Sequence, residues 1–187
     1  MSKPANEMIL VLDFGGQYNQ LIARRVRDNN VFAEILPYTA GLDEIRAGGY
    51  KGVIFTGGPN SVYDMASPHY TADILDLGVP ILGICYGCQL MAHLLGGEVT
   101  PAQDDTAREY GKTRTCFDTS CRLFQGLPEE SVTWMSHGDY MARVPARFTL
   151  AAFVSLLGLS TMTSVRDSRT CPAFRVGQCS AGNGSAP

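Results

Sequence analysis

The chain has 187 residues, of which 45% are hydrophobic, and its formal net charge is −3. This length and composition are typical of one globular domain with a sizeable core. The slight negative charge excludes a generally basic nucleic-acid-binding surface, and no apolar run approaches the ~20 residues that a membrane-spanning helix needs. We therefore expect neither a nucleic-acid partner nor a membrane partner.

The N-terminus does not have the residue order of a secretion signal. Its first apolar run, Met8 to Leu12, is short and is followed at once by Asp13 and by Gly15-Gly16. The only cluster of basic residues, Arg24, Arg25 and Arg27, lies in a helical pattern, and we interpret it as a solvated helix face. These features predict a cytoplasmic protein.

Strands and helices alternate through the first half of the chain. Continuous apolar runs, rather than alternating ones, indicate strands that are covered on both faces, and apolar residues at helical spacing lie between them. This order predicts right-handed crossovers and a mostly parallel sheet, with ligands bound at the carboxyl ends of the strands. The predicted strands are 8–14, 33–38, 52–56 and 79–85, and the predicted helices start near Tyr18 and cover about 70–77 and 86–95.

The second half contains shorter strand patterns, at 109–115, 131–137 and 148–156. The predicted fold class is therefore α/β: a mostly parallel central sheet flanked by helices in three layers, with short additional strands in the second half. We expect a domain over residues 1–150 and an atypical tail over 151–187. The composition changes near residue 150, and the final "GQCSAGNGSAP" is of a disordered type.

Cys85 is the strongest candidate for a chemically active residue. The segment "GICYGC" places it after an apolar strand and before a helix, between Gly83 and Gly87. This is the pattern of a nucleophile elbow, in which a sharp turn exposes the nucleophile. The N-terminus of the following helix is expected to favour the thiolate over the thiol.

Three other interpretations of Cys85 remain open. A free cysteine can be a compact buried hydrophobe. Cys85 and Cys88 form a C-x-x-C pair at a helix start, which is typical of thiol-disulfide enzymes. A zinc site formed with Cys116 and Cys121 is disfavoured by the irregular spacings, and we predict no metal. All six cysteines are expected to be reduced, because they are dispersed through a chain with a large core.

Several segments together resemble a known family. "GICYGCQLMAHLLGG" resembles the nucleophile segment of class I (triad) glutamine amidotransferases, and "VIFTGGPNSVYD" resembles their oxyanion-strand segment. "VTWMSHGD", "REYGK" and "ILVLDFGGQYNQLIARRVR" are similar to segments of one subfamily, the amidotransferase domains of GMP synthases. The resemblance covers about residues 8–150 and implies the family's flavodoxin-like three-layer fold.

The resemblance also implies a reaction. Glutamine would be hydrolysed to glutamate and ammonia through a thioester on Cys85, and the ammonia would aminate XMP to GMP on an ATP-pyrophosphatase synthetase domain or subunit. ATP and Mg²⁺ are expected only in that synthetase unit, which this chain lacks, and no cofactor is expected here. The implied oxyanion donors are the backbone N–H groups of Gly58 and Tyr86, and the implied substrate-binding residues are Gly57, Gln89, Ser136 and His137.

The family's general base has no counterpart in this sequence. The family places it in a segment of the type G-V-Q-F-H-P-E, whereas His69, His93 and His137 are the only histidines here and none precedes Pro-Glu. The resemblance therefore predicts an impaired glutaminase. Two alternatives stay open: a non-catalytic glutamine-binding or interaction domain, and, less favoured, a thiol-disulfide oxidoreductase.

The missing segment coincides with the change in composition, and we expect a shift of reading frame near residue 152. If this is correct, sequencing the encoding DNA will reveal a neighbouring frame that encodes a His-Pro-Glu segment. A gene in which no neighbouring frame encodes that segment contradicts the frameshift hypothesis.

Overall fold

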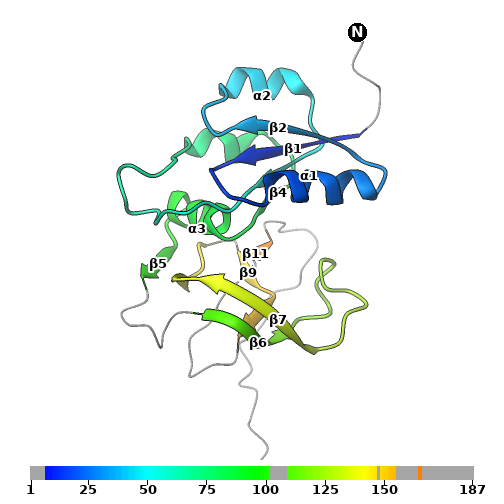
Figure 1. Cartoon of the computed structure of the whole chain (residues 1–187), viewed down its shortest axis with the longest axis vertical. Helices are drawn as coiled ribbons and strands as arrows, with labels where there is room; N and C mark the ends of the chain where they lie inside the picture. The colour runs from blue at the N-terminus through cyan, green and yellow to red at the C-terminus, as the bar shows by residue number, and fades with distance from the viewer. Residues whose placement is uncertain (1–6, 102–108, 147, 155–163, 166–187) are drawn as a thin grey trace, which may run out of the picture.

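The computed structural model describes residues 7–101, 109–146, 148–154 and 164–165. Its first half is a four-stranded parallel sheet in the order β2-β1-β3-β4, and its second half consists of short antiparallel strands packed below α3 (Figure 1). The predicted α/β class, with its mostly parallel sheet and additional strands, is confirmed. The elements of the parallel half are β1 (Met8–Asp13), α1 (Asn19–Asp28), β2 (Phe32–Pro37), α2 (Leu42–Gly48), β3 (Gly52–Phe55), the 3₁₀ helix η1 (Ala72–Asp76), β4 (Ile81–Gly83) and α3 (Tyr86–Leu94).

Helices cover both faces of the parallel sheet, which explains the continuous apolar runs of its strands. Val11 of β1 faces α1, where Ala23 and Val26 pack against it. The alternate residues Leu10 and Leu12 face the opposite side. There they belong to the main core, to which α2, η1 and α3 contribute Ile45, Ile74, Leu75, Leu90 and Met91.

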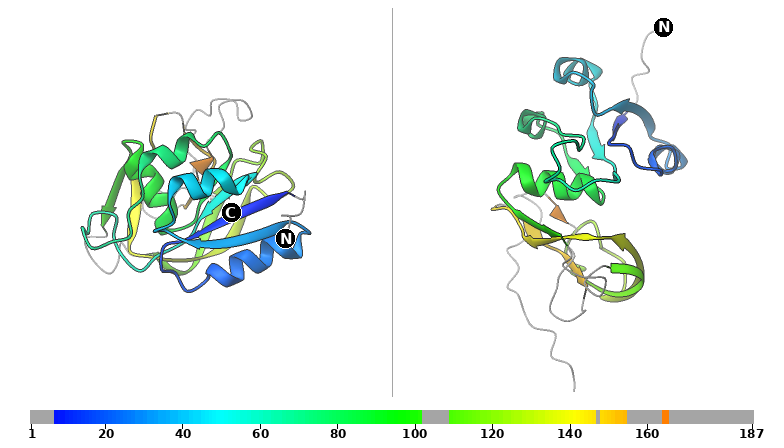
Figure 2. Two further views of the ribbon diagram at one scale, coloured as in Figure 1. Left: turned by 90° about the horizontal axis from the view of Figure 1, so that it is seen from above. Right: turned by 60° about the vertical axis from the view of Figure 1, so that its left-hand side comes forward.

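The second half forms three small antiparallel groups. β5 (Glu98–Pro101) pairs with β8 (Asp139–Arg143), and β6 (Glu109–Phe117) pairs with β7 (Glu130–His137). The predicted strand at 148–156 is divided into β9 (Thr149–Leu150), which pairs with β11 (Ser164–Val165), and β10 (Ala152–Val154), which pairs with β6. The two views of Figure 2 show that these strands form a layer of their own, beside α3 rather than at the edge of the parallel sheet.

The helix predicted at 70–77 needs correction, and the predicted disorder of the C-terminal end cannot be compared with the described residues. The helix expected at 70–77 is η1, a short 3₁₀ helix that ends just before the turn at Gly78, where φ is +75°. The 3₁₀ bonds run from Ile74 N–H to the Thr71 carbonyl and from Leu77 N–H to the Ile74 carbonyl. Residues 166–187, which include the end predicted to be disordered, lie outside the described residues.

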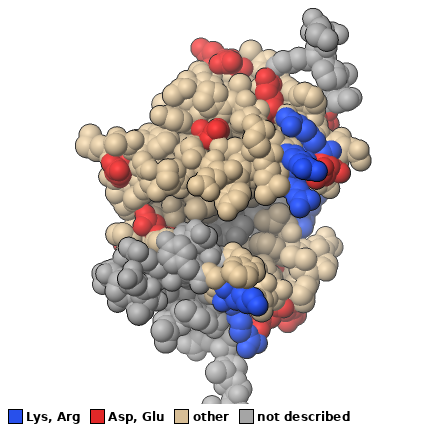
Figure 3. All heavy atoms as spheres, viewed as in Figure 1, with Lys and Arg blue, Asp and Glu red and all other residues tan. Residues whose placement is uncertain are grey.

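The arginines of α1 form a solvent-exposed face, as the sequence predicts. Arg24, Arg25 and Arg27 are all exposed, and Figure 3 shows basic side chains gathered over this part of the molecule. Arg25 lies 3.5 Å from Asp28, and Arg27 donates a hydrogen bond to the Ala33 carbonyl. Within the described ranges, no helix has the length and apolar character needed to cross a membrane.

The start of α3 packs directly on the ends of β3 and β4, and two glycines make this contact possible. A Cβ on Gly83 would lie 2.6 Å from the Cα of Cys88, and a Cβ on Gly87 would lie 2.5 Å from the carbonyl oxygen of Phe55. Real Cβ atoms do not approach backbone atoms so closely. Neither glycine has a positive φ, so both are required for close packing rather than for an unusual backbone conformation.

We predict that Gly87→Ala destabilises the protein by about 1–3 kcal/mol, because the new methyl group would overpack the contact with β3. In an unhindered helix, the same change would stabilise by up to about 1 kcal/mol through helix propensity. Urea unfolding followed by circular dichroism measures the difference. Gly138→Ala is the control, since a Cβ there meets no atom within 4 Å and the residue has no positive φ. Equal or greater stability of Gly87→Ala would contradict the packing argument.

Candidate active site

Cys85 lies in the turn between β4 and α3, in a conformation that few residues adopt. Its φ is 52° and its ψ is −115°, and among the described non-glycine residues only Asn30 also has a positive φ. Such a conformation costs about 1–3 kcal/mol and persists where the surrounding packing enforces it. Cys85 is exposed, while its neighbour Tyr86 is fully buried. The local geometry is therefore that of a nucleophile elbow, and Cys85 is not a buried core residue.

The Gly57-Gly58 turn follows β3 and lies next to Cys85. A Cβ on Gly57 would be 3.6 Å from the Cβ of Cys85, an ordinary contact distance. A Cβ on Gly58 would be 2.8 Å from the Phe14 carbonyl oxygen, so only glycine fits there. The carboxyl ends of two neighbouring parallel strands therefore meet at the cysteine, as the sequence predicts. The oxyanion-binding role of Gly58 and Tyr86 stays a prediction.

The electrostatic environment of Cys85 is less favourable to the thiolate than expected. Burial of the sulfur within its turn raises the pKa of the Cys85 thiol above its ordinary value, although the residue as a whole is exposed. A hydrogen bond from the backbone N–H of Tyr86 lowers this pKa, and the carboxylate of Asp139 raises it. The helix N-terminus thus acts in the expected direction, but desolvation outweighs it.

Gln89 connects α3 to the second half of the chain. Its side chain is 9% exposed, and its Nε2 donates a hydrogen bond of 2.9 Å to the backbone carbonyl of Asp139. Asp139 starts β8 and follows the end of β7, where Ser136 and His137 lie. The fold therefore brings Gln89 and the β7–β8 turn together. The side chains of Ser136 and His137 lie outside the described residues, so their substrate-binding role stays a prediction.

A cleft of about 650 Å³ opens at Cys85. One wall comes from the parallel half, with Gly57, Gly58 and Gln89, and the other comes from the antiparallel strands. The second wall includes Trp134, which is 74% exposed, and the hydroxyls of Thr115 and Thr133, which lie 2.6 Å apart. A pocket of this volume, with few polar groups around an exposed cysteine, can hold a molecule of amino-acid size.

Two parts of the cleft lining were missed by sequence reasoning. The segment Gly15 to Asn19 also lines the cleft, and its place after β1 could have identified it, since loops at the carboxyl ends of parallel strands bind ligands. Thr133 and Trp134 belong to the segment "VTWMSHGD", whose family resemblance did point to the substrate side, whereas Thr115 had no sequence signal. The contribution of Thr115 depends on how the two layers pack.

Among the described residues that line the cleft there is no histidine. The ring of His69 lies 3.2 Å from the Asp64 carbonyl, and the ring of His93 packs edge-on against Tyr63. Neither imidazole belongs to the cleft. In the part of the chain that the structure describes, no group of three His, Cys, Asp or Glu residues could hold a metal ion, so nothing supports a zinc site at the cysteines.

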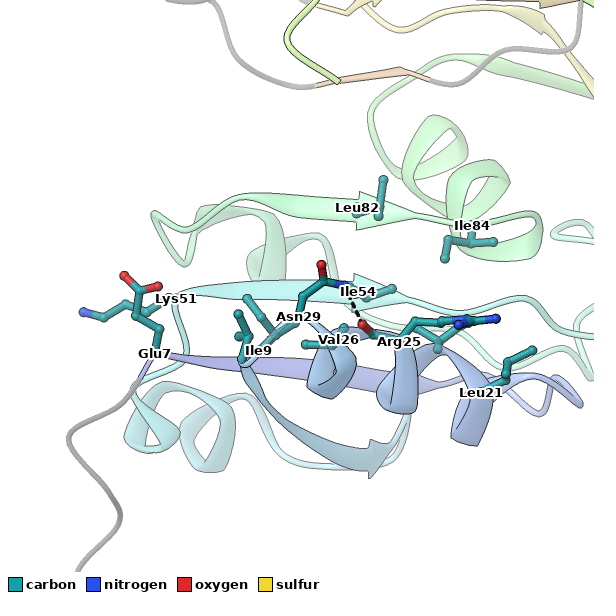
Figure 4. A pocket seen from close by; sticks show the side chains of 12 residues that line it. Glu7, Ile9, Leu21, Arg25, Val26, Asn29, Lys51, Ile54, Leu82 and Ile84 are labelled. Atoms are coloured by element: carbon teal, nitrogen blue, oxygen red, sulfur yellow. Dashed lines mark hydrogen bonds between the residues drawn. The ribbon is translucent and has the colours of Figure 1, made fainter. Parts of the chain in front are cut away.

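A second hollow, of about 770 Å³, lies on the α1 face of the sheet (Figure 4). Its floor is aliphatic, with Ile54 and Leu82 from the sheet and Ile84 just after β4, and the charged residues Glu7 and Lys51 lie at its rim. The described residues that line it include no cysteine, serine or histidine. This lining therefore offers no thiol, hydroxyl or imidazole, and the cleft at Cys85 is the better candidate for an active site.

Comparisons with known proteins identify the family. Residues 10–166 match the family described as glutamine amidotransferase class-I. The glutamine-hydrolysing GMP synthase of Acetivibrio thermocellus is 56% identical over 147 residues, which cover 79% of this chain and 28% of that protein. The enzyme of the same name from Clostridium botulinum is 52% identical over 159 residues, which cover 85% of this chain and 31% of that protein. The chain thus spans less than a third of the length of these relatives.

Solved structures give the same result for the fold. A candidate GMP synthase subunit from Thermoplasma acidophilum superposes with a TM-score of 0.64 and 30% sequence identity, over 82% of this chain and 75% of that one. A glutamine amidotransferase from Thermotoga maritima superposes with a TM-score of 0.60 at 19% identity, over 85% of this chain and 70% of that one. At this lower identity the likeness shows the fold alone.

We predict that Cys85 reacts with iodoacetamide only slowly at neutral pH and that the rate is still rising above the usual titration range of a thiol. Only the thiolate reacts, and the raised pKa displaces its formation towards alkaline pH. Asp139→Asn removes the nearby negative charge and should shift the pH profile to lower pH. This substitution retains the backbone carbonyl to which Gln89 donates.

Alkylation followed by peptide mass spectrometry over a pH series measures both profiles. Glu98→Gln is the control, because it also removes one acidic charge but does not line the cleft. A profile that is unchanged or moves to higher pH in Asp139→Asn would contradict the electrostatic argument.

Proposed function

Since the chain belongs to the class I glutamine amidotransferase family, we propose that it is the glutaminase domain of a GMP synthase, with glutamine as substrate and ammonia as product. The observation that carries this proposal is the strained, exposed Cys85 beside the Gly57-Gly58 turn. A nucleophile held on such a turn can reach a carbonyl carbon in the cleft while backbone N–H groups lie near its oxygen.

In the proposed mechanism, the sulfur of Cys85 attacks the side-chain amide carbon of glutamine. The carbonyl oxygen becomes an oxyanion that accepts hydrogen bonds from the N–H groups of Gly58 and Tyr86, each contributing about 3 kcal/mol to transition-state stabilisation. The C–N bond then breaks, the nitrogen takes up a proton and leaves as ammonia, and a glutamyl thioester remains. Water hydrolyses the thioester to glutamate and restores the thiol.

The substrate's amino-acid end is assigned to the other side of the cleft. Gln89, held by its hydrogen bond to the Asp139 carbonyl, stands between Cys85 and the β7–β8 turn. In this proposal Gly57, Gln89, Ser136 and His137 hold the α-carboxylate and α-amino group. This arrangement would leave the amide end of glutamine facing Cys85.

The ammonia is proposed to pass to an ATP-pyrophosphatase synthetase domain or subunit, which would use ATP and Mg²⁺ to aminate XMP. The names of the relatives and their much greater length support such a partner, because more than two thirds of each lies outside the region matched here. The chemistry proposed at Cys85 is the same whether or not the partner is part of the same polypeptide.

The chain alone is proposed to be a poor catalyst. The thiol has a raised pKa, and the described lining of the cleft offers no imidazole to remove its proton or to protonate the departing nitrogen. A positioned acid or base typically contributes about 10²–10⁴-fold to the rate. The proposal includes residues 151–187 as an atypical segment, for which a change of reading frame would account, although the family match extends to residue 166.

A chloroketone analogue of glutamine separates an assembled site from its catalytic competence. We predict that it alkylates Cys85, that excess glutamine protects the residue, and that ammonia release from glutamine is about 10²–10⁴-fold slower than in a complete amidotransferase. Mass spectrometry locates the adduct, and a coupled ammonia assay measures turnover.

Two variants test whether the analogue labels Cys85 specifically. Cys85→Ala should abolish the adduct, whereas Cys116→Ser, on β6, should retain it. A folded chain that is not labelled would favour a non-catalytic interaction domain over the glutaminase. Turnover equal to that of a complete amidotransferase would contradict the proposed impairment.

A further inference from the structure

Cys88 lines the same cleft as Cys85, but the proposed hydrolysis assigns no role to it. It lies on the first turn of α3, three residues after the nucleophile. Its surroundings differ from those of Cys85, since Cys88 is half-buried and packs against the main core, whereas Cys85 is exposed. The pair therefore combines a thiol that reagents in the cleft can reach with a second, more protected thiol close behind it.

The backbone holds the two residues at a distance that a disulfide can bridge. The N–H of Cys88 donates a hydrogen bond of 3.0 Å to the carbonyl of Cys85, which closes a four-residue turn. In such a turn, the first and last Cα atoms lie less than about 7 Å apart. Disulfides join cysteines whose Cα atoms are about 4.4–6.8 Å apart. The separation of the two Cα atoms therefore meets the backbone condition for a disulfide between Cys85 and Cys88.

The other described cysteines are placed differently. Cys121 is 1% exposed within a separate small core, and Cys116 lies on β6 in the antiparallel layer. Neither lines the cleft. An oxidant that enters the cleft would thus meet Cys85 first and Cys88 second.

We propose that hydrogen peroxide converts Cys85 and Cys88 into an intramolecular disulfide that reversibly blocks the nucleophile. The thiolate form of Cys85 is the minor form at neutral pH, because burial raises the pKa of the thiol. This thiolate attacks one peroxide oxygen, the O–O bond breaks, and hydroxide leaves and takes up a proton to form water. The resulting Cys85 sulfenic acid is attacked by the Cys88 sulfur, the S–O bond breaks, and the second water leaves with the thiol proton. Two thiols are oxidised by two electrons, and one hydrogen peroxide is reduced to two waters.

The consequence is protection of Cys85 against irreversible damage. A sulfenic acid without a neighbouring thiol is oxidised further to sulfinic and sulfonic acids, which thiol reductants do not reverse. A disulfide can be reduced by ordinary dithiols. The proposed glutaminase function is needed only to say which activity is blocked, and the oxidation chemistry can be tested without any assay of glutamine hydrolysis.

The sequence permits a direct test on the full chain. Trypsin cleaves after Lys51 and Arg108, so residues 52–108 form one peptide in which Cys85 and Cys88 are the only cysteines. After treatment with hydrogen peroxide and alkylation, we expect this peptide to lose about 2 Da relative to the reduced, unalkylated form and to incorporate no alkylating agent. Dithiothreitol should restore alkylation of both residues. Residues 115–122, which contain Cys116 and Cys121, provide an internal control that should stay reduced.

Two variants test whether Cys88 is the specific disulfide partner of Cys85 or whether the cysteines are oxidised without such specificity. Cys88→Ser should lose the disulfide and accumulate a species heavier by about 32 Da, the sulfinic acid, at Cys85. Cys116→Ser should form the disulfide as the unmodified chain does. Circular dichroism verifies that each variant is folded. The proposal is overturned if the unmodified chain shows no such disulfide, whether peptide 52–108 stays reduced or is oxidised as in Cys88→Ser.

Discussion

The close contact between the start of α3 and the ends of β3 and β4 is the constraint on which the rest of the site depends. It exists because Gly83 and Gly87 leave no side chains between the helix and the strands. Tyr86 is locked on the inner side of the turn, where its ring packs 5.8 Å from that of Phe14 and its hydroxyl donates to the Pro68 carbonyl. With Gly83 and Tyr86 held against the sheet, Cys85 between them adopts a positive φ and is exposed at the turn.

The same contact explains which effects raise and which lower the pKa of the Cys85 thiol. Packing places the N–H of Tyr86 against the thiol, which favours the thiolate, but it also removes water and leaves the Asp139 carboxylate nearby, which both favour the neutral thiol. The net result is a thiol that is positioned at the cleft but has a raised pKa. A cysteine in this state needs a base to take its proton, so the lack of a family-type His-Pro-Glu segment matters more here than it would for a cysteine that ionises by itself.

Prediction from sequence succeeded where the signal was local. The strands β1 to β4 appear as apolar runs because both faces of the sheet are covered. Cys85 could be identified because the residues that form the turn are adjacent in the sequence. The failures also have local causes. α2 was missed because only Ile45 of its seven residues is buried, so no apolar periodicity develops. The stretch 148–156 was predicted as one strand, but its parts pair with different partners, β11 and β6.

The sequence by itself determined the α/β class, the order of the elements in the parallel half, the cysteine at the turn and the two glycines beside it, since each depends on residues adjacent in the chain. Only the tertiary structure decided that Trp134, Thr115 and Thr133 form the opposite wall of the cleft and that Gln89 binds the Asp139 carbonyl. It also decided that desolvation outweighs the helix N-terminus at Cys85. These outcomes depend on contacts between segments far apart in the chain. The free energy of burying the Cys85 thiol, for example, is set by the neighbours that tertiary packing brings to it.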